Sequence, residues 1–156
     1  MKLYIDIRED DFDVGYEQKK LAEDSPKAGG QVIFVGLVRD YNSQETHSVL
    51  ALELSHYPGM TEKAIERICR QAEKRWTLNS VRVIHRVGKL KSQEQIVLVA
   101  VASPHRAEAF QGAEFIMDEL KTNATFWKKE IHSDGEQWLD MKESDIKRSE
   151  KWRDEP

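Results

Sequence analysis

The 156-residue chain has little of what marks several large classes of protein. Its one cysteine, Cys69, excludes an internal disulfide and any metal site that needs two cysteines. No apolar run approaches the roughly 20 residues that cross a bilayer, and the N-terminus lacks the apolar core of a secretion signal. A net charge of -4 argues against binding nucleic acid through overall basicity. We therefore expect a cytoplasmic protein that binds neither membrane nor nucleic acid.

Common motifs for metal and cofactor binding are also missing. The chain has no Gly-rich phosphate loop, no Gly-x-Ser-x-Gly turn and no His-Glu-x-x-His helix. The histidines lack the short spacing that metal ligands have; they are His47, His56, His85, His105 and His132. The sequence therefore predicts neither a metal nor a bound cofactor.

The lone cysteine shares one apolar helical face with Ile65, Ile68 and Ala72. This pattern favours a small buried side chain for Cys69, and a nucleophile is the alternative. An enzyme of sulfur chemistry with such a cysteine would need its sulfur to be delivered from outside.

Apolar periodicity predicts one α+β domain over residues 1–156, with a mostly antiparallel sheet. The predicted strands are 3–7, 32–38, 49–54, 81–87 and 95–102 around a turn at 88–94, and 126–131. The predicted helices are 14–23, 60–76, one that opens at Ser103-Pro104 and buries Phe110, Ala113, Met117 and Leu120, and a polar tail from 143. Both faces of 32–38 are apolar, which predicts a central strand covered on each side. About fifteen residues at the end are expected to be loosely attached.

The first candidate site is Ser103-Pro104-His105-Arg106, where a predicted strand ends and a helix begins. Unpaired backbone N–H groups and the helix dipole attract an anion at such a position. His105 and Arg106 add two side chains that donate hydrogen bonds to phosphate. Positive side chains in a first turn oppose the dipole, which favours a compensating anion; an exposed surface pair is the alternative.

The second candidate site contains Lys121 and the strand after it. Lys121 ends the predicted third helix, where a cation also suits the dipole, so a structural role is the alternative. Alternation separates Lys128 from Lys129, and one of them is expected to lie along the apolar Phe126. A lysine held there, near other cations, loses preference for its charged form and becomes a usable acid or nucleophile. Solvated lysines are the commoner alternative.

Two further positions carry cationic side chains. Arg39 ends the strand that is apolar on both faces and precedes a polar stretch, 41–48, typical of a loop that reaches over a site. His85 and Arg86 end another strand, and Gly88 permits the turn. A structural role is favoured for His85, since its ring can hydrogen-bond across the sheet.

Five short motifs occur in one order along the chain. They are Phe34-x-Gly36-x-Val38-Arg39, His56-Tyr57-Pro58-Gly59-Met60, His85-Arg86-Val87-Gly88, Ser103-x-His105-Arg106, and Asp118-x-Leu120-Lys121 through Trp127-Lys128-Lys129-Glu130. Each is weak alone. Together they resemble the large, catalytic subunit of molybdopterin synthase, the MoaE family, over nearly the whole chain. The resemblance implies an α/β hammerhead-type domain with an added antiparallel β subdomain.

The resemblance also implies a sulfurtransferase that converts cyclic pyranopterin monophosphate to molybdopterin. Two sulfurs would come from the thiocarboxylate on the Gly-Gly tail of a small ubiquitin-like partner, and two large subunits would form a homodimer within a heterotetramer. By position, Lys121 and Lys128 match the family's two essential lysines. Arg39, His105 and Arg106 match residues that hold the substrate. We expect Lys121 to steady the carbonyl of the tail and Lys128 to stabilise charge or donate a proton.

Three other positions bear on this expectation. Glu130 is expected to orient Lys128. Thr125 stands where the family usually has Pro, which predicts a less rigid entry to the strand. At the position of Lys142 the resemblance implies an Arg that binds substrate in its own or in the neighbouring subunit's site. A lysine keeps the charge but loses bidentate phosphate binding.

Two other functions fit the same residues. A non-catalytic module would bind a partner's extended Gly-Gly tail or a phosphorylated ligand, although retention of both Lys121 and Lys128 argues against it. A lysine Schiff-base enzyme acting on a sugar phosphate would be trapped by borohydride, whereas sulfur transfer requires no imine.

Overall fold

The first of two sheets forms the centre of the molecule. The computed structural model describes residues 1–39, 50–132 and 135–153. The first sheet has the order β1–β4–β6–β2 and consists of β1 (Lys2–Arg8), β4 (Ser80–Arg86), β6 (Gln95–Ser103) and β2 (Gly30–Leu37). β1 and β4 are parallel, and the other two pairs are antiparallel. Alternating apolar residues of β4 and β6 supply a separate core cluster on each face.

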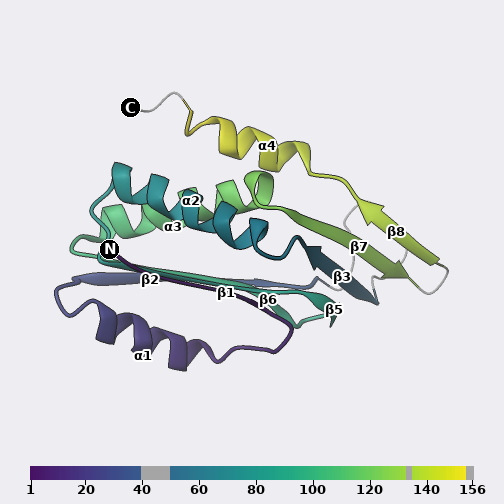
Figure 1. The fold of residues 1–156 in the computed structure, drawn as a ribbon, viewed down its shortest axis with the longest axis horizontal. Coiled ribbons are helices and arrows are strands. Elements are labelled where there is room, and N and C mark those ends of the chain that lie inside the picture. The colour runs from purple at the N-terminus through teal and green to yellow at the C-terminus, as the bar shows by residue number, and fades with distance from the viewer. Residues whose placement is uncertain (40–49, 133–134, 154–156) are drawn as a thin grey trace.

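Helices cover both faces of this sheet, as Figure 1 shows. α1 (Val14–Asp24) lies on one face, and α2 (Met60–Arg75) and α3 (Arg106–Asn123) lie on the other. None of the described helices is long and apolar enough to cross a membrane. Cys69 of α2 is completely buried, and burial raises the pKa of its thiol to about 12. The prediction of a small buried side chain at Cys69 is confirmed.

A second, antiparallel sheet adjoins the end of the first (Figure 1). It has the order β5–β3–β7–β8 and consists of β5 (Gly88–Lys91), β3 (Ala51–His56), β7 (Phe126–His132) and β8 (Gly135–Leu139). The α+β class with mostly antiparallel pairing is confirmed. The sequence predicts neither β5 nor β8, since strands of 4 and 5 residues are too short to show alternation. β7 follows α3 directly, so the second sheet meets the C-terminal end of α3.

The last described helix, α4 (Glu143–Glu150), packs on α3. Beyond it, Trp152 is only 5% exposed and lies in the main core, with its ring edge-on to Trp76 and Phe115 at centroid distances of 5.5 Å. The expectation of a loosely attached C-terminal segment was therefore wrong. The polar pattern of this segment did not indicate that Trp152 anchors it in the core. That residues 1–156 form a single domain stays a prediction.

β2 differs from its expected position. Within the described ranges it pairs with β6 alone, so β2 is an edge strand, and β4 and β6 are the central strands. Phe34 and Leu37 of β2 remain 44% and 50% exposed. The prediction of a central strand was wrong, because an apolar pattern on both faces carries no information about which neighbour covers it.

The third helix begins later than the capping signal predicts. Ser103 is the last residue of β6 and donates its hydroxyl to the Thr77 carbonyl oxygen at 2.7 Å. α3 starts at Arg106, after His105 as the N-cap. Phe110 is 63% exposed and does not belong to the buried stripe. The buried apolar residues of α3 are Ala109, Gly112, Ala113, Phe115, Ile116 and Leu120.

Candidate functional site

Lys121 and Lys128 come together where α3 ends and β7 begins. Lys121 lies in the last turn of α3, and Lys128 lies near the start of β7. The pKa of Lys128 falls to about 7, chiefly because burial disfavours its charged form and next because Lys121 is close enough to repel and hydrogen-bond with it. The predicted loss of preference for the charged form is confirmed for Lys128. At neutral pH this side chain is divided between ammonium and amine, which suits a residue that exchanges protons.

Lys129, on the opposite face of β7, has a different environment. Its Nζ is 2.9 Å from Glu53 on β3 and 3.2 Å from Glu136 on β8. Hydrogen bonds to these two carboxylates raise the pKa of Lys129. The charge of Lys129 is therefore compensated on its own face of the sheet, and Lys128 is the lysine of this pair that belongs to the site.

The start of α4 brings two more charges to Lys128. Lys142 is the N-cap of α4, and Asp145 lies in its first turn. The Asp145 carboxylate raises the pKa of Lys128, and the Lys142 ammonium opposes it with a smaller effect. Lys142, a candidate from the resemblance, therefore lies near the lysine pair of its own chain. Asp145 is a neighbour that sequence reasoning missed, since an acid in a first helical turn is common for reasons of the dipole alone.

His85 reaches the same junction from the first sheet. Its ring stacks on Phe126 of β7, with centroids 3.8 Å and planes 16° apart. Its Nδ1 lies 2.8 Å from the Arg86 carbonyl oxygen, which can only accept, so Nδ1 carries the proton. Burial lowers the pKa of His85 to about 3, and the lysine pair and His56 also disfavour its cation. His85 is therefore a neutral ring that joins the two sheets. This fits the structural role favoured from sequence, although its hydrogen bond goes to the next residue of its own strand and not across the sheet.

A hydrogen bond secures the entry to β7. Thr61 of α2 is fully buried and donates its hydroxyl to the Thr125 carbonyl oxygen at 2.9 Å. The same hydroxyl oxygen accepts from the Tyr57 backbone N–H at 2.9 Å. The backbone just before β7 is thus held by a contact to α2. The position of Lys128 therefore depends on that contact as well as on the sheet.

Arg39 lies at the same end of the first sheet as the lysine pair. Leu37 of β2 is paired with Gln95, at the start of β6, and α3 returns over the sheet toward this end (Figure 1). The Arg39 side chain is exposed, just beyond Val38, which is buried against the second sheet. The predicted loop at 41–48 lies outside the described residues.

His105 and Arg106 lie at the opposite end of α3 from Lys121. Because an α-helix rises ~1.5 Å per residue, Arg106 and Lys121 are about 22 Å apart along α3. Both His105 and Arg106 are exposed. The resemblance assigns His105, Arg106 and Lys121 to one substrate site, but within one chain the 18 residues of α3 hold its two ends too far apart to form that site.

Glu130 is buried beside Lys128 on β7. It is 5% exposed, and its Oε1 is 3.2 Å from His132 Nε2. A buried carboxylate paired in this way is fixed in direction. Its expected role in orienting Lys128 stays a prediction.

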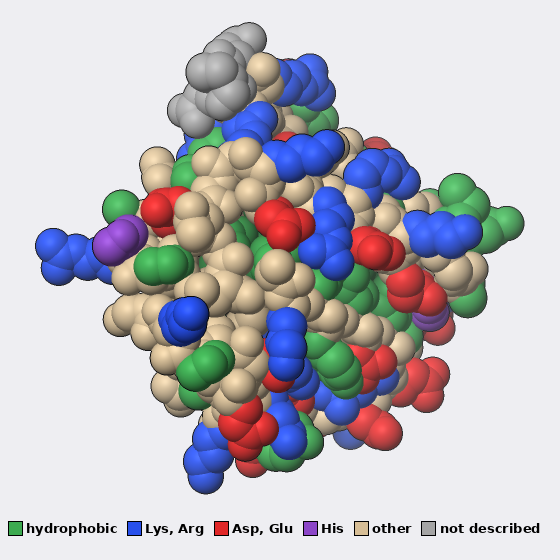
Figure 2. All heavy atoms as spheres, turned by 60° about the vertical axis from the view of Figure 1, so that its left-hand side comes forward, with side chains coloured by type: hydrophobic (Ala, Val, Ile, Leu, Met, Phe, Trp, Pro, Cys, Tyr) green, Lys and Arg blue, Asp and Glu red, His purple; other side chains and the backbone are tan. Residues whose placement is uncertain are grey.

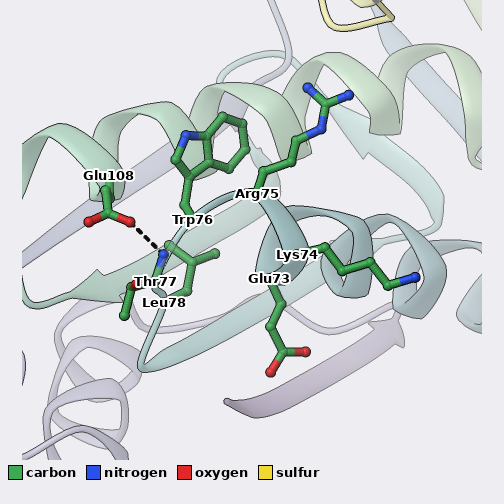
Figure 3. Close-up of a pocket in the computed structure, with 7 residues that line it drawn as sticks. All are labelled: Glu73, Lys74, Arg75, Trp76, Thr77, Leu78 and Glu108. Atoms are coloured by element: carbon green, nitrogen blue, oxygen red, sulfur yellow. Dashed lines mark hydrogen bonds between the residues drawn. The ribbon is translucent and has the colours of Figure 1, made fainter. Parts of the chain in front are cut away.

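A pocket of about 380 Å³ lies near the start of α3 (Figure 3) and is lined by Glu73, Lys74, Arg75, Trp76, Thr77, Leu78 and Glu108. The Glu108 carboxylate accepts from the Thr77 backbone N–H, drawn as a dashed line in Figure 3. Charges of both signs line this pocket. Figure 2, which brings this end of the molecule forward, likewise shows acidic and basic side chains interspersed. None of the candidate residues lines the pocket, so the lysine junction is the better candidate site.

Comparisons with known proteins agree on one family. The family model described as MoaE protein matches residues 7–123. A molybdopterin synthase catalytic subunit from Vibrio cholerae is 49% identical over 148 residues, covering 95% of this chain and 97% of that protein. A solved molybdopterin biosynthesis MoaE protein from Burkholderia ambifaria has a TM-score of 0.83 at 46% identity, covering 99% of this chain and 100% of that one. A complex of subunits 1 and 2 of molybdopterin-converting factor from Helicobacter pylori shares the fold, with a TM-score of 0.66, 18% identity and coverages of 88% and 89%.

The fold and the site define an α+β protein with two lysines paired where two sheets meet. The chain belongs to the MoaE family, because the family model matches most of its length and a relative nearly half identical aligns with almost all of it. The resemblance inferred from five motifs is confirmed.

Proposed function

We propose that this chain is the catalytic subunit of a cytoplasmic molybdopterin synthase. It converts cyclic pyranopterin monophosphate to molybdopterin with two sulfurs from the thiocarboxylated Gly-Gly tail of a small ubiquitin-like partner. The observation that carries the proposal is the pairing of Lys121 with Lys128, whose pKa of about 7 suits proton exchange, in a chain of this family. A phosphate, a thiocarboxylate and a released carboxylate are all anions, so fixed positive charge assists each step.

The two lysines have separate roles in this proposal. Lys121 binds the terminal carbonyl of the partner's tail. Lys128, whose pKa of about 7 lies near neutral pH, donates a proton as oxygen leaves the substrate. Cys69 is unsuited to carry the sulfur, because it is completely buried and the pKa of its thiol is about 12. This supports a sulfur that arrives on the partner.

The complete site requires two copies of the chain in this proposal. Arg106 and Lys121 are about 22 Å apart along α3, too far for one substrate phosphate to contact both. His105 and Arg106 of one copy therefore serve the lysine pair of the other. Arg39, Glu130 and Lys142 serve the substrate beside the lysines. The exposed apolar residues on the edge strand β2 suit a homodimer at the centre of a heterotetramer.

Reconstitution tests the activity. The chain is mixed with a thiocarboxylated Gly-Gly partner and the cyclic pterin precursor, and dithiolene product is measured. We expect product from the wild type, a loss of about a hundredfold or more in Lys121→Ala and in Lys128→Ala, and a change of less than about twofold in the matched control Lys129→Ala. No product from the wild type, or full activity in both Lys121→Ala and Lys128→Ala, would overturn the proposal. Borohydride is expected to trap no imine; trapping would favour the Schiff-base alternative.

Subunit complementation tests the shared site. Lys128→Ala and Arg106→Ala chains are each expected to be nearly inactive. If the two residues act across the dimer, a mixed dimer has one site with both residues intact, so equal mixing after subunit exchange restores about a quarter of wild-type activity. If both act within one chain, every site in the mixture keeps a defect. Failure to recover activity in demonstrated mixed dimers would refute the shared site.

A further inference from the structure

Asp118 is a buried carboxylate of α3, one helical turn before Lys121. Its Oδ1 accepts from Arg148 Nε at 3.0 Å, and its Oδ2 accepts from Trp152 Nε1 at 2.9 Å. Lys151 Nζ lies 3.7 Å from the same Oδ2. All three partners belong to α4 or to the residues just after it. Asp118 therefore fastens the C-terminal helix to α3.

α3 and α4 run antiparallel (Figure 1). Each helix carries an acidic and a basic residue one helical turn apart. On α3, Lys121 follows Asp118 by one turn; on α4, Asp145 precedes Arg148 by one turn. The ion pair between Arg148 and Asp118 therefore contributes to the register between the helices. One turn further along, this register brings the half-buried Asp145 to the end of α3, where the lysine pair lies.

The other end of α4 is fixed in the core. Trp152 contacts Trp76 and Phe115, and Arg75 donates to its carbonyl oxygen. Glu114, one turn before Asp118 on α3, accepts from Arg148 Nη2 at 3.0 Å. A shift of α4 by one turn would expose the tryptophan and break these bonds. The register is therefore specific.

Lys128 has charged or titratable neighbours on three elements packed around it. Lys121 comes from α3, Lys142 and Asp145 come from α4, and His85 comes from β4. The two lysines disfavour the ammonium form of Lys128, and Asp145 favours it. His85 is neutral near pH 7, because burial lowers its pKa to about 3.

We propose that Asp118 is a positioning residue that, through its contacts with Arg148 and Trp152, holds α4 in the register that brings the Asp145 carboxylate to the lysine pair at the end of α3. The geometry for this is the clamp of Arg148 and Trp152 on Asp118, with Asp145 one turn from it. Its consequence for sulfur transfer rests on the proposed function, whereas the proton affinity of Lys128 is a property of the folded chain.

A double-mutant cycle tests the clamp, with NMR titration of the Lys128 ε-carbon in the full chain as the measurement and Lys128→Met for assignment. In the native background, Asp145→Asn is expected to lower the ratio of ammonium to amine at pH 7 about threefold, because a nearby carboxylate charge is lost. In an Arg148→Gln background, which breaks the ion pair from its exposed side, the same change is expected to alter the ratio by less than about 1.3-fold.

Asp118→Asn provides a second background, and the Arg148→Gln arm decides the outcome if the buried change prevents folding. Glu119→Gln is the matched control: it removes a carboxylate from the same helix whose hydrogen bond goes to Asn123 within α3. It should leave the full effect of Asp145→Asn. An equal effect of Asp145→Asn with and without the clamp, or no effect in the native background, would overturn the proposal. If the NMR titration shows the coupling but the pH profile of product formation does not change in the same variants, the role of Lys128 in the proposed function is wrong. The positioning role of Asp118 is then still supported.

Discussion

Lys128 and Lys129 are adjacent on β7 and lie on opposite faces of the second sheet. On one face, burial and Lys121 lower the pKa of Lys128 to about 7. On the other face, hydrogen bonds to Glu53 and Glu136 raise the pKa of Lys129. Residue type and sequence position are nearly identical for the two lysines, so their surroundings alone account for the difference. A lysine becomes chemically useful where burial and a neighbouring cation outweigh the carboxylates around it.

The largest expected difference between the two lysines is in stability. Lys128→Met replaces a buried amine by an apolar side chain of similar length, and it should raise the free energy of unfolding at pH 7 by an amount on the order of 3 kcal/mol. The folded-state pKa of about 7 lies below the ordinary 10.5, so the wild type carries the full cost below about pH 7 and loses it as the pH rises toward 10.5. The advantage of Lys128→Met should shrink over that window in urea unfolding experiments.

The matched control for this prediction is Lys129→Met. Its stability difference from wild type should stay flat between pH 7 and pH 9, because the pKa of Lys129 is raised and the side chain does not titrate there. A pH-independent difference for Lys128→Met, or the same slope in both variants, would contradict the contrast between the two faces.

A smaller effect is expected on the face of Lys129. Replacing both partners, Glu53→Gln with Glu136→Gln, should return the pKa of Lys129 toward its ordinary value and shift the unfolding temperature by no more than about 2 °C, since the carboxylates are largely solvated. Calorimetry at low and at high salt measures this. A loss of many degrees would mean that these ion pairs organise the second sheet. Lys129 could then no longer serve as the solvated lysine with which Lys128 is compared.

Much of the fold is readable from local periodicity. The pattern over α2 fixes both its length and its buried face, and the alternation of β4 and β6 fixes their place in the core. Periodicity reports which face of a segment is apolar and says nothing about the neighbour that covers it. This is why β2 was expected at the centre of the sheet, and why Phe110 was assigned to the buried stripe of α3.

The site was predictable only where it depends on residues close together in the sequence. Lys121 and Lys128 are close in sequence, and only Ala124 and Thr125 separate α3 from β7, so their proximity follows from local structure. His85 and Asp145 reach Lys128 from segments far away in the chain, and their contact depends on how α4 and the two sheets pack. The separation of Arg106 from Lys121, by contrast, follows from the helical rise alone and could have been calculated from the predicted helix.

The length of α3 has a consequence for which changes the protein tolerates. Each residue of an α-helix turns the chain by about 100° and advances it by ~1.5 Å. Inserting or deleting one residue within α3 would rotate Lys121 away from β7 while leaving Arg106 where it is. Substitutions on the solvent side of this helix should be accepted readily. Insertions and deletions should not, because the number of residues in α3 fixes the distance between Arg106 and Lys121.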